Sequence, residues 1–174
     1  LLFLRDLETK LVARARTFIR EELKCPVAIT DLNNDGGQYV GYRRLMNDEF
    51  DYLDQHFYED HPQYLGVRLQ MPAKLGMNNI NSIRNGDMGA IKSVGNRLYG
   101  QPYCFTEFNY CAPGRYRFSG GLVFGAQAAL QDWAGLWQHS YELPNSTARF
   151  GWFEVPKDPL MRAFTRAIFF LYAH

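Results

Sequence analysis

The most telling run in the chain is Pro102-Tyr103-Cys104-Phe105-Thr106-Glu107-Phe108-Asn109-Tyr110. Its aromatic and apolar residues predict a short buried strand. Burying a carboxylate is costly unless the carboxylate is paired or lies at a strand end that faces a cleft. Glu107 is therefore either one half of a structural ion pair or a functional group, and the run alone favours neither.

Outward from this run, the chain alternates between strand and helix patterns. Alternation of this kind favours a parallel sheet in an α/β fold. Residues 59–85 form a long polar stretch, and a loop of that length inside a compact domain is usually functional or a lid. We expect one domain over residues 1–174, with a helix at 2–23, strands at 27–30, 52–58, 103–108 and 136–141, and helices at 38–49, 87–99, 120–133 and from Pro156 to near His174.

Composition excludes several classes of function. The net charge of +1 gives no electrostatic case for nucleic acid, and no apolar run has the length of a membrane span. Aromatic residues reach 16%, which suits sugar stacking or a subunit interface.

Three cysteines at these spacings make neither a disulfide framework nor a metal cluster, although Cys104 and Cys111 could pair. No metal or cofactor is expected. Because the chain starts at Leu1 and lacks an initiator Met, we expect a fragment or a trimmed chain and assign no location.

Polar and aromatic residues gather where the predicted strands end. In parallel α/β folds, functional side chains lie at the carboxyl ends of strands. Side chains alternate along a strand, so His56 and Tyr58 share one face, as do Glu107 and Asn109. Together with Trp137 they supply a carboxylate, groups that bind hydroxyls and an aromatic platform. This set indicates a sugar-binding site.

Each of these residues also has a structural interpretation. His56 suits a hydrogen-bonded core histidine, and Trp137 suits the core. Arg115 and Arg117 suit solvated loop charges, although the neighbouring Tyr116 allows a sugar-binding edge. The spacing of the histidines and Glu107 fits no metal site.

The ordered motifs resemble a known family. Gln55-His56-Phe57-Tyr58, Asp60-His61-Pro62, Thr106-Glu107-Phe108-Asn109 and Arg115-Tyr116-Arg117 are similar to the retaining glycoside hydrolases of clan A, which are (β/α)₈ barrels of the cellulase and β-galactosidase type. The resemblance covers nearly the whole chain but only the second half of the barrel. It implies that Glu107 is the nucleophile near the end of strand seven, that Tyr58 supports it, and that His56 lines the site. Trp137 is the nearest match to the sugar platform of strand eight.

The resemblance lacks one catalytic group. The family's acid/base glutamate sits in an Asn-Glu pair, which this chain does not contain, and retaining hydrolysis needs two carboxyls about 5–5.5 Å apart. Asp31, Asp54 and Glu142 are carboxylates near predicted strand ends that could replace it, although nothing in the family pattern supports them. The chain is thus expected to carry the nucleophile and sugar-binding residues of a retaining β-glycosidase without its acid. The alternative is a non-catalytic module that only binds carbohydrate or self-assembles.

The predicted fold is half of a (β/α)₈ barrel with four parallel strands. Such a half leaves its inner face and two sheet edges uncovered. We therefore expect either a homodimer that closes an eight-stranded barrel or a complementing N-terminal half. A flavodoxin-like open sheet is disfavoured, since no glycine-rich phosphate loop follows the first predicted strand.

Overall fold

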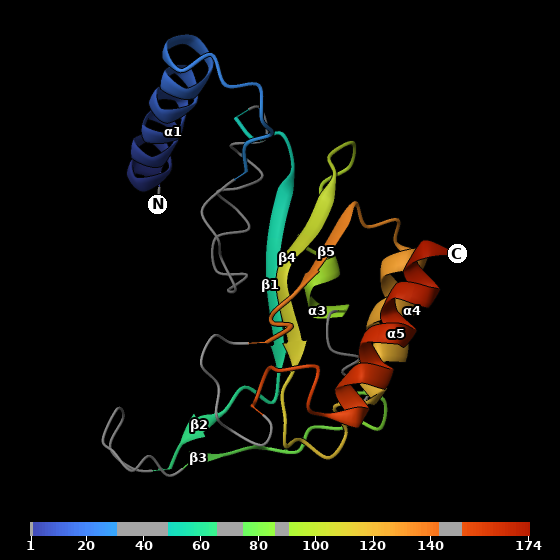
Figure 1. The fold of residues 1–174 in the computed structure, drawn as a ribbon. Coiled ribbons are helices and arrows are strands. Elements are labelled where there is room, and N and C mark those ends of the chain that lie inside the picture. Colours follow the sequence, from blue (N-terminus) through green and yellow to red (C-terminus); the bar gives the residue numbers. More distant parts are fainter. Residues whose placement is uncertain (1, 31–48, 66–74, 86–90, 143–150) are drawn as a thin grey trace.

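A three-stranded parallel sheet forms the centre of the fold. The computed structural model describes residues 2–30, 49–65, 75–85, 91–142 and 151–174 (Figure 1). The strands of the central sheet follow the order β1-β4-β5, and two very short strands form a separate antiparallel sheet beyond their carboxyl ends. The strands are β1 (Leu53–Glu59), β4 (Tyr103–Tyr110) and β5 (Gly135–Gln138), and then β2 (Gln63–Tyr64) and β3 (Leu75–Gly76).

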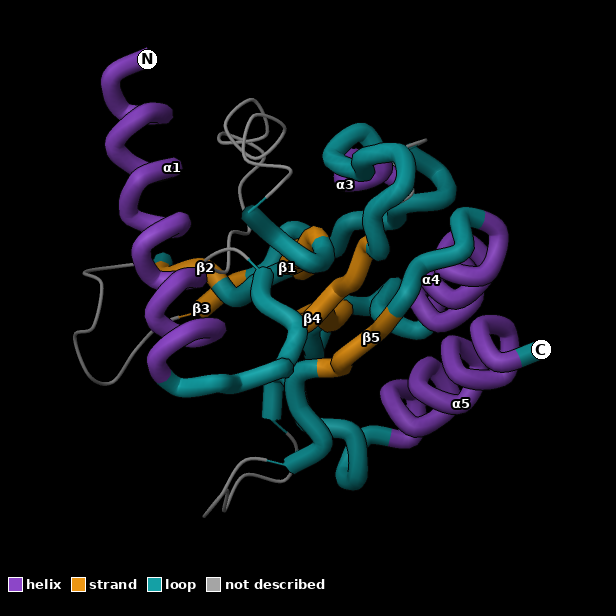
Figure 2. The backbone as a smooth tube through the Cα atoms, turned by 90° about the horizontal axis from the view of Figure 1, so that it is seen from above, coloured by secondary structure: helices purple, strands orange, loops and turns teal. Residues whose placement is uncertain are grey.

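Two helices cover one face of the central sheet. Helices α4 (Ser119–Leu130) and α5 (Pro159–Ala173) lie side by side there, while α1 (Leu2–Thr17) lies apart with the sheet between (Figure 2). Helix α1 continues into a π-helical turn, η1 (Phe18–Glu22), and α3 is a single turn at Ile91–Val94. Among the described residues, no helix has both the length and the apolar character that crossing a membrane requires.

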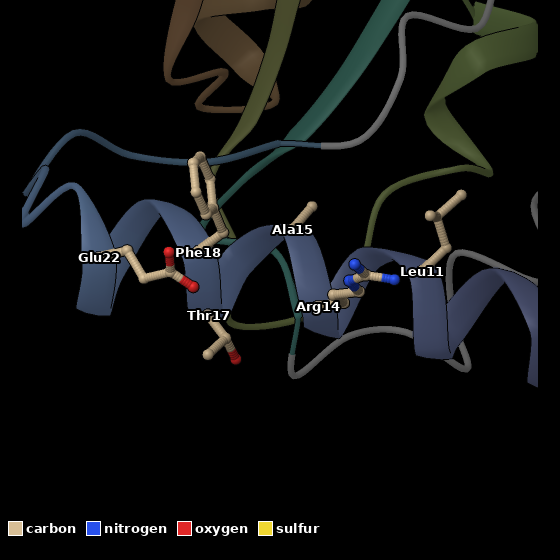
Figure 3. A pocket seen from close by; sticks show the side chains of 6 residues that line it. All are labelled: Leu11, Arg14, Ala15, Thr17, Phe18 and Glu22. Atoms are coloured by element: carbon tan, nitrogen blue, oxygen red, sulfur yellow. The ribbon is translucent and has the colours of Figure 1, made fainter.

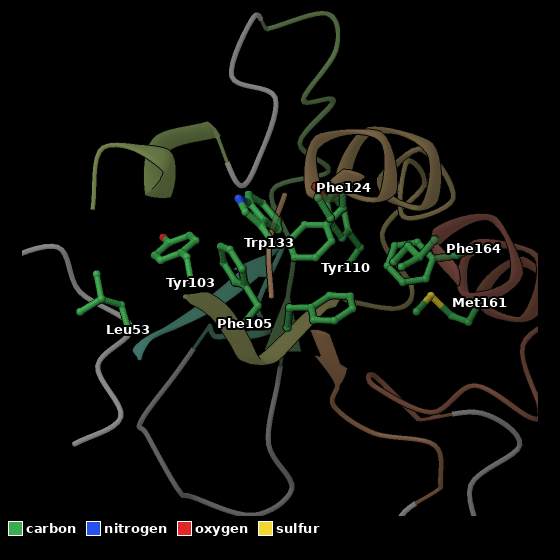
Figure 4. Close-up of a cluster of buried hydrophobic side chains, with 11 residues drawn as sticks. Leu53, Tyr103, Phe105, Tyr110, Phe124, Trp133, Met161 and Phe164 are labelled. Atoms are coloured by element: carbon green, nitrogen blue, oxygen red, sulfur yellow. The ribbon is translucent and has the colours of Figure 1, made fainter. Parts of the chain in front are cut away.

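Aromatic side chains form the core between the sheet and its two helices. Phe105 and Phe108 of β4 pack on Phe124 of α4, with ring centroids 5.1 and 4.3 Å apart, and all three rings are fully buried (Figure 4). The ring of Trp133 packs beside that of Phe105, with the centroids 4.5 Å apart. Each buried ring contributes roughly 1.5–3 kcal/mol of hydrophobic stabilisation. The core therefore fixes β4, the strand that carries Glu107, against α4.

Helix α5 begins later than Pro156, the start that the sequence indicated. Asp158 is its N-cap and accepts a hydrogen bond from the backbone N–H of Leu160 at 2.9 Å, and Pro159 occupies the first turn. The same carboxylate receives two hydrogen bonds from Arg117, at 2.7 and 3.1 Å. This buried pair ties the loop after β4 to the start of α5, so Arg117 is a structural residue.

The prediction of half a (β/α)₈ barrel is wrong. The described residues form a three-stranded parallel sheet and a two-stranded antiparallel sheet, where four parallel strands in strand–helix units were expected. The pairing of two chains into an eight-stranded barrel rested on four strands per chain and loses its basis. Self-association as such stays a prediction.

Residues 27–30, which were predicted to form the first strand, form no strand. Side chains bond to the backbone of this run instead. Arg20 donates to the carbonyls of Cys25 and Val27, and the Asp51 carboxylate accepts from the backbone N–H of Ile29 at 2.7 Å. One backbone hydrogen bond, from Asp51 N–H to the Ile29 carbonyl, joins this run to the approach to β1. Backbone N–H and carbonyl groups that would pair with a neighbouring strand are thus bonded to side chains. Residues 27–30 therefore form no regular ladder of backbone hydrogen bonds.

The remaining differences concern the predicted helices and the long loop. The predicted helix 38–49 falls, apart from residue 49, outside the described residues. The predicted helix 87–99 is helical at Ile91–Val94, and residues 86–90 lie outside the described part. The long stretch 59–85 includes the small β2–β3 sheet, which joins Tyr64 to Leu75.

Helix α1 lies on the surface of the molecule. None of its residues is buried, and the Asp51 carboxylate bonds it to the body through Arg16 and, on η1, Arg20. These bonds, first of all that from Arg16, lower the pKa of Asp51. A pocket of about 640 Å³ lies along this helix between Leu11 and Glu22 (Figure 3). None of the predicted site residues lines it.

Candidate functional site

The candidate site lies on the sheet face that α4 and α5 leave open, near the carboxyl ends of the strands. Here β1 and β4 pair in parallel, but the register shifts by one residue. Gln55 faces Phe105 while His56 faces Glu107, so Thr106 is the additional residue of a β-bulge. The bulge leaves the side chains of both Thr106 and Glu107 on the open face, where each contacts His56.

The carboxylate of Glu107 has a different neighbour at each oxygen. The Tyr58 hydroxyl donates a short hydrogen bond to Oε1, and Nδ1 of His56 lies 3.6 Å from Oε2. The side chain of Glu107 is 34% exposed. The carboxylate is thus oriented from both sides and still reachable from solvent, as a nucleophile has to be.

Rings hold Tyr58 in place. His61 and Phe153 each lie 5.4 Å from the Tyr58 ring, measured between centroids, and His139 lies 6.3 Å away. Burial, followed by the hydrogen bond to Glu107, raises the pKa of Tyr58 well above its ordinary value. The phenol therefore stays protonated and acts as a donor to Glu107.

Trp137 offers an exposed aromatic surface at the level of Glu107. In the pairing of β4 with β5, Phe105 faces Leu136 and Phe108 faces Gln138, which puts Trp137 opposite the bulge. Its indole lies over Gly135, where a Cβ would come within 2.3 Å of the ring. The side chain remains 55% exposed. Aromatic faces of this kind bind the apolar faces of sugars.

Two of the predicted sugar-binding residues are not joined to this group. Asn109 is fully buried, and its amide donates to the backbone carbonyls of His139 and Phe153 while its side-chain oxygen accepts from Tyr110. Asn109 therefore fixes the segment after β5 beneath the site. Arg115 is exposed on the loop after β4, where its backbone N–H donates to Asn79 at 2.9 Å. No side-chain contact joins Arg115 to Glu107 in the described part of the chain.

The carboxylates considered as a replacement acid bond to other groups where the structure describes them. Asp54 bonds to Thr106, and Glu142 pairs with Lys157 at 3.3 Å. Asp31 lies outside the described residues. The described residues also contain no group of three or more His, Cys, Asp or Glu side chains able to hold a metal ion.

A second pocket is lined in part by chain neighbours of two rings that surround Tyr58. It has a volume of about 280 Å³, and its lining includes Pro62 and Trp152. These two residues are the chain neighbours of His61 and Phe153. Phe153 itself was missed by the sequence analysis, because it comes from a loop more than ninety residues after Tyr58 and no local pattern marks it.

Comparison with known proteins adds no family to this geometry. No protein-family model matches the chain, and no curated protein matches it significantly.

Proposed function

We propose that this chain carries the nucleophile and the sugar platform of a retaining β-glycosidase site. One observation supports this most: Glu107 is oriented by a phenol at one oxygen and an imidazole at the other, level with the exposed ring of Trp137. A β-glycoside is the substrate class that the resemblance to clan A implies.

In this proposal the Glu107 carboxylate attacks the anomeric carbon of a sugar stacked on Trp137. The new carboxylate–carbon bond forms as the bond from that carbon to the leaving oxygen breaks, and a glycosyl ester results. Water then cleaves the ester and releases the sugar with its original configuration. Tyr58 donates to the carboxylate throughout, so it fixes the direction of attack.

The leaving group decides what this site can cleave. An alkoxide leaving group needs a proton from an acid, and the Asn-Glu pair that carries the family's acid does not occur in this sequence. A dinitrophenolate leaves without protonation. We therefore expect turnover of dinitrophenyl β-glycosides and far slower turnover of alkyl β-glycosides.

The test compares the unmodified chain with Glu107→Gln on a panel of dinitrophenyl β-glycosides. The amide keeps the shape of the side chain but is a poor nucleophile, so release of dinitrophenolate should fall by a factor of about 10³ or more, which is about 4 kcal/mol of transition-state stabilisation. Equal rates for both proteins would exclude Glu107 as the nucleophile. Trp137→Ala should raise KM, because it removes the platform and leaves the carboxylate in place.

A second candidate is a carbohydrate-binding module without catalysis. The observation in its favour is that Trp137 is exposed while the Asn-Glu pair that carries the family's acid is absent from the sequence. Under this function the chain binds β-linked oligosaccharides in calorimetry and Trp137→Ala abolishes binding. Dinitrophenyl β-glycosides are then not turned over, and Glu107→Gln leaves hydrolysis at the background rate.

A further inference from the structure

We propose that Asp54 and Thr106 are positioning residues that fix the tautomer of His56 and so reserve its Nδ1 atom for Glu107. The role of Glu107 as a nucleophile rests on the function proposed above, but the tautomer itself does not. Two successive hydrogen bonds, from Thr106 to Asp54 and from His56 to Thr106, set the tautomer by their directions.

The first bonds join Thr106 to Asp54. Both the backbone N–H of Thr106, at 3.2 Å, and its hydroxyl donate to Oδ1 of Asp54. The Asp54 carboxylate is 3% exposed. A hydroxyl has a single proton, so the proton of Thr106 is committed to Asp54.

The next bond fixes the imidazole. Nε2 of His56 lies 3.2 Å from Oγ1 of Thr106, and that oxygen has only lone pairs left to offer. Two lone pairs do not attract each other, so Nε2 must carry a proton. In the neutral ring Nδ1 is then the free basic nitrogen.

The free nitrogen faces the carboxylate. Nδ1 lies 3.6 Å from Oε2 of Glu107, too far for a hydrogen bond at rest and close enough to form one after a small movement. Any second proton that His56 accepts must bind at Nδ1, directly beside Oε2. The positive charge and the donor then both stabilise the ionised carboxylate, which is the reactive form of a nucleophile.

The bulge makes this arrangement possible. In a regular strand Thr106 and Glu107 would point to opposite faces. The additional residue brings the hydroxyl and the carboxylate to the same face, one on each side of the His56 ring. Strand β4 therefore supplies both the Thr106 hydroxyl, which sets the tautomer of His56, and the Glu107 carboxylate, which faces the free nitrogen.

The test measures the tautomer by ¹⁵N NMR of the histidine ring nitrogens, in a basic buffer in which the chain stays folded. Loss of a signal in His56→Gln assigns the ring. We expect a proton on Nε2 and none on Nδ1 in the unmodified chain and in Thr106→Ser. In Thr106→Val, which keeps the branched shape but has no hydroxyl, the proton should move to Nδ1, because Glu107 is then the remaining acceptor.

Two results would overturn the proposal: a proton on Nδ1 in the unmodified chain, or an unchanged tautomer in Thr106→Val. The first needs no variant, so a failure of Thr106→Val to fold leaves the proposal testable. Glu107→Gln is the matched control and should keep the proton on Nε2. If the tautomer is as expected but Glu107→Gln leaves turnover unchanged, the glycosidase proposal fails and the tautomer assignment stands.

Discussion

Helix α4 packs against α5 through glycines that a helix would ordinarily avoid. A Cβ added at Gly121 would lie 2.7 Å from the carbonyl oxygen and 2.8 Å from the Cα of Phe164 on α5. At Gly125 it would lie 2.9 Å from the Cα of Ile168. These neighbours are backbone atoms that cannot rotate away, so any Cβ forces the two helices apart.

The effect of Gly121→Ala is the sum of two opposing terms. Replacing glycine by alanine inside a helix normally raises the free energy of unfolding by about 1 kcal/mol. Overpacking a tight contact lowers it by about 1–3 kcal/mol, and contacts below 3 Å with backbone belong to the upper part of that range. We expect a net loss of about 1–2 kcal/mol, or roughly 2–8 °C in Tm for a domain of this size.

Urea unfolding followed by circular dichroism measures the change. Ala126→Gly, on the exposed side of the same helix, gives the propensity term alone and should cost about 1 kcal/mol. If Gly121→Ala proves more stable than the unmodified chain by that amount, the close approach of α4 and α5 is wrong.

Two further predictions concern buried charge and buried thiols. Asp158→Asn keeps a good N-cap for α5 but leaves the Arg117 guanidinium, 13% exposed, without its counter-charge, so the free energy of unfolding should fall by about 3 kcal/mol at pH 7. Although burial pushes the pKa of Asp158 up, its bonds to Arg117 hold it below the ordinary value. The ionised Asp158 carboxylate therefore stabilises the fold fully above pH about 4, and this stabilisation is lost as the pH falls through the pKa that Asp158 has in the folded chain. The difference in free energy of unfolding between the unmodified chain and Asp158→Asn should thus become smaller in acid. Burial raises the pKa of Cys104 to about 11 and that of Cys111 to about 12, so a thiol reagent at pH 8 should modify Cys25 in the native chain and all three cysteines after unfolding. Rapid native modification of Cys104 or Cys111 would contradict the packing of β4.

The sequence predicted how several residues of the candidate site lie, because strand alternation is a local property. The pattern around Glu107 predicted β4, and alternation along β1 correctly put His56 and Tyr58 on one face. It could not predict the bulge at Thr106, because a shift of register depends on how two strands pair. It also assigned Asn109 to the sugar, whereas long-range backbone bonds hold that side chain beneath the site.

Two features of the fold depend on contacts between segments that lie apart in the sequence. Residues 27–30 have the composition of a strand, but Arg20 and Asp51 bond to their backbone groups at Val27 and Ile29 instead. Helix α4 was predicted from apolar spacing despite its glycines, and the structure shows that those glycines serve the contact with α5. Contacts between distant segments decide both cases, and no window of sequence contains them.

The proposed function requires that Glu107 acts as a carboxylate nucleophile. The most direct measurement is incubation with a dinitrophenyl 2-deoxy-2-fluoro-β-glycoside, followed by peptide mass spectrometry. The fluorine slows cleavage of the glycosyl ester, and the activated leaving group requires no acid, so the test does not depend on a second carboxylate. The proposed function predicts one fluoroglycosyl group per chain on the peptide that contains Glu107, and none in Glu107→Gln. Label on another carboxylate would contradict the proposed function. Absence of label with every sugar of the panel whose dinitrophenyl β-glycoside the chain hydrolyses would contradict it as well.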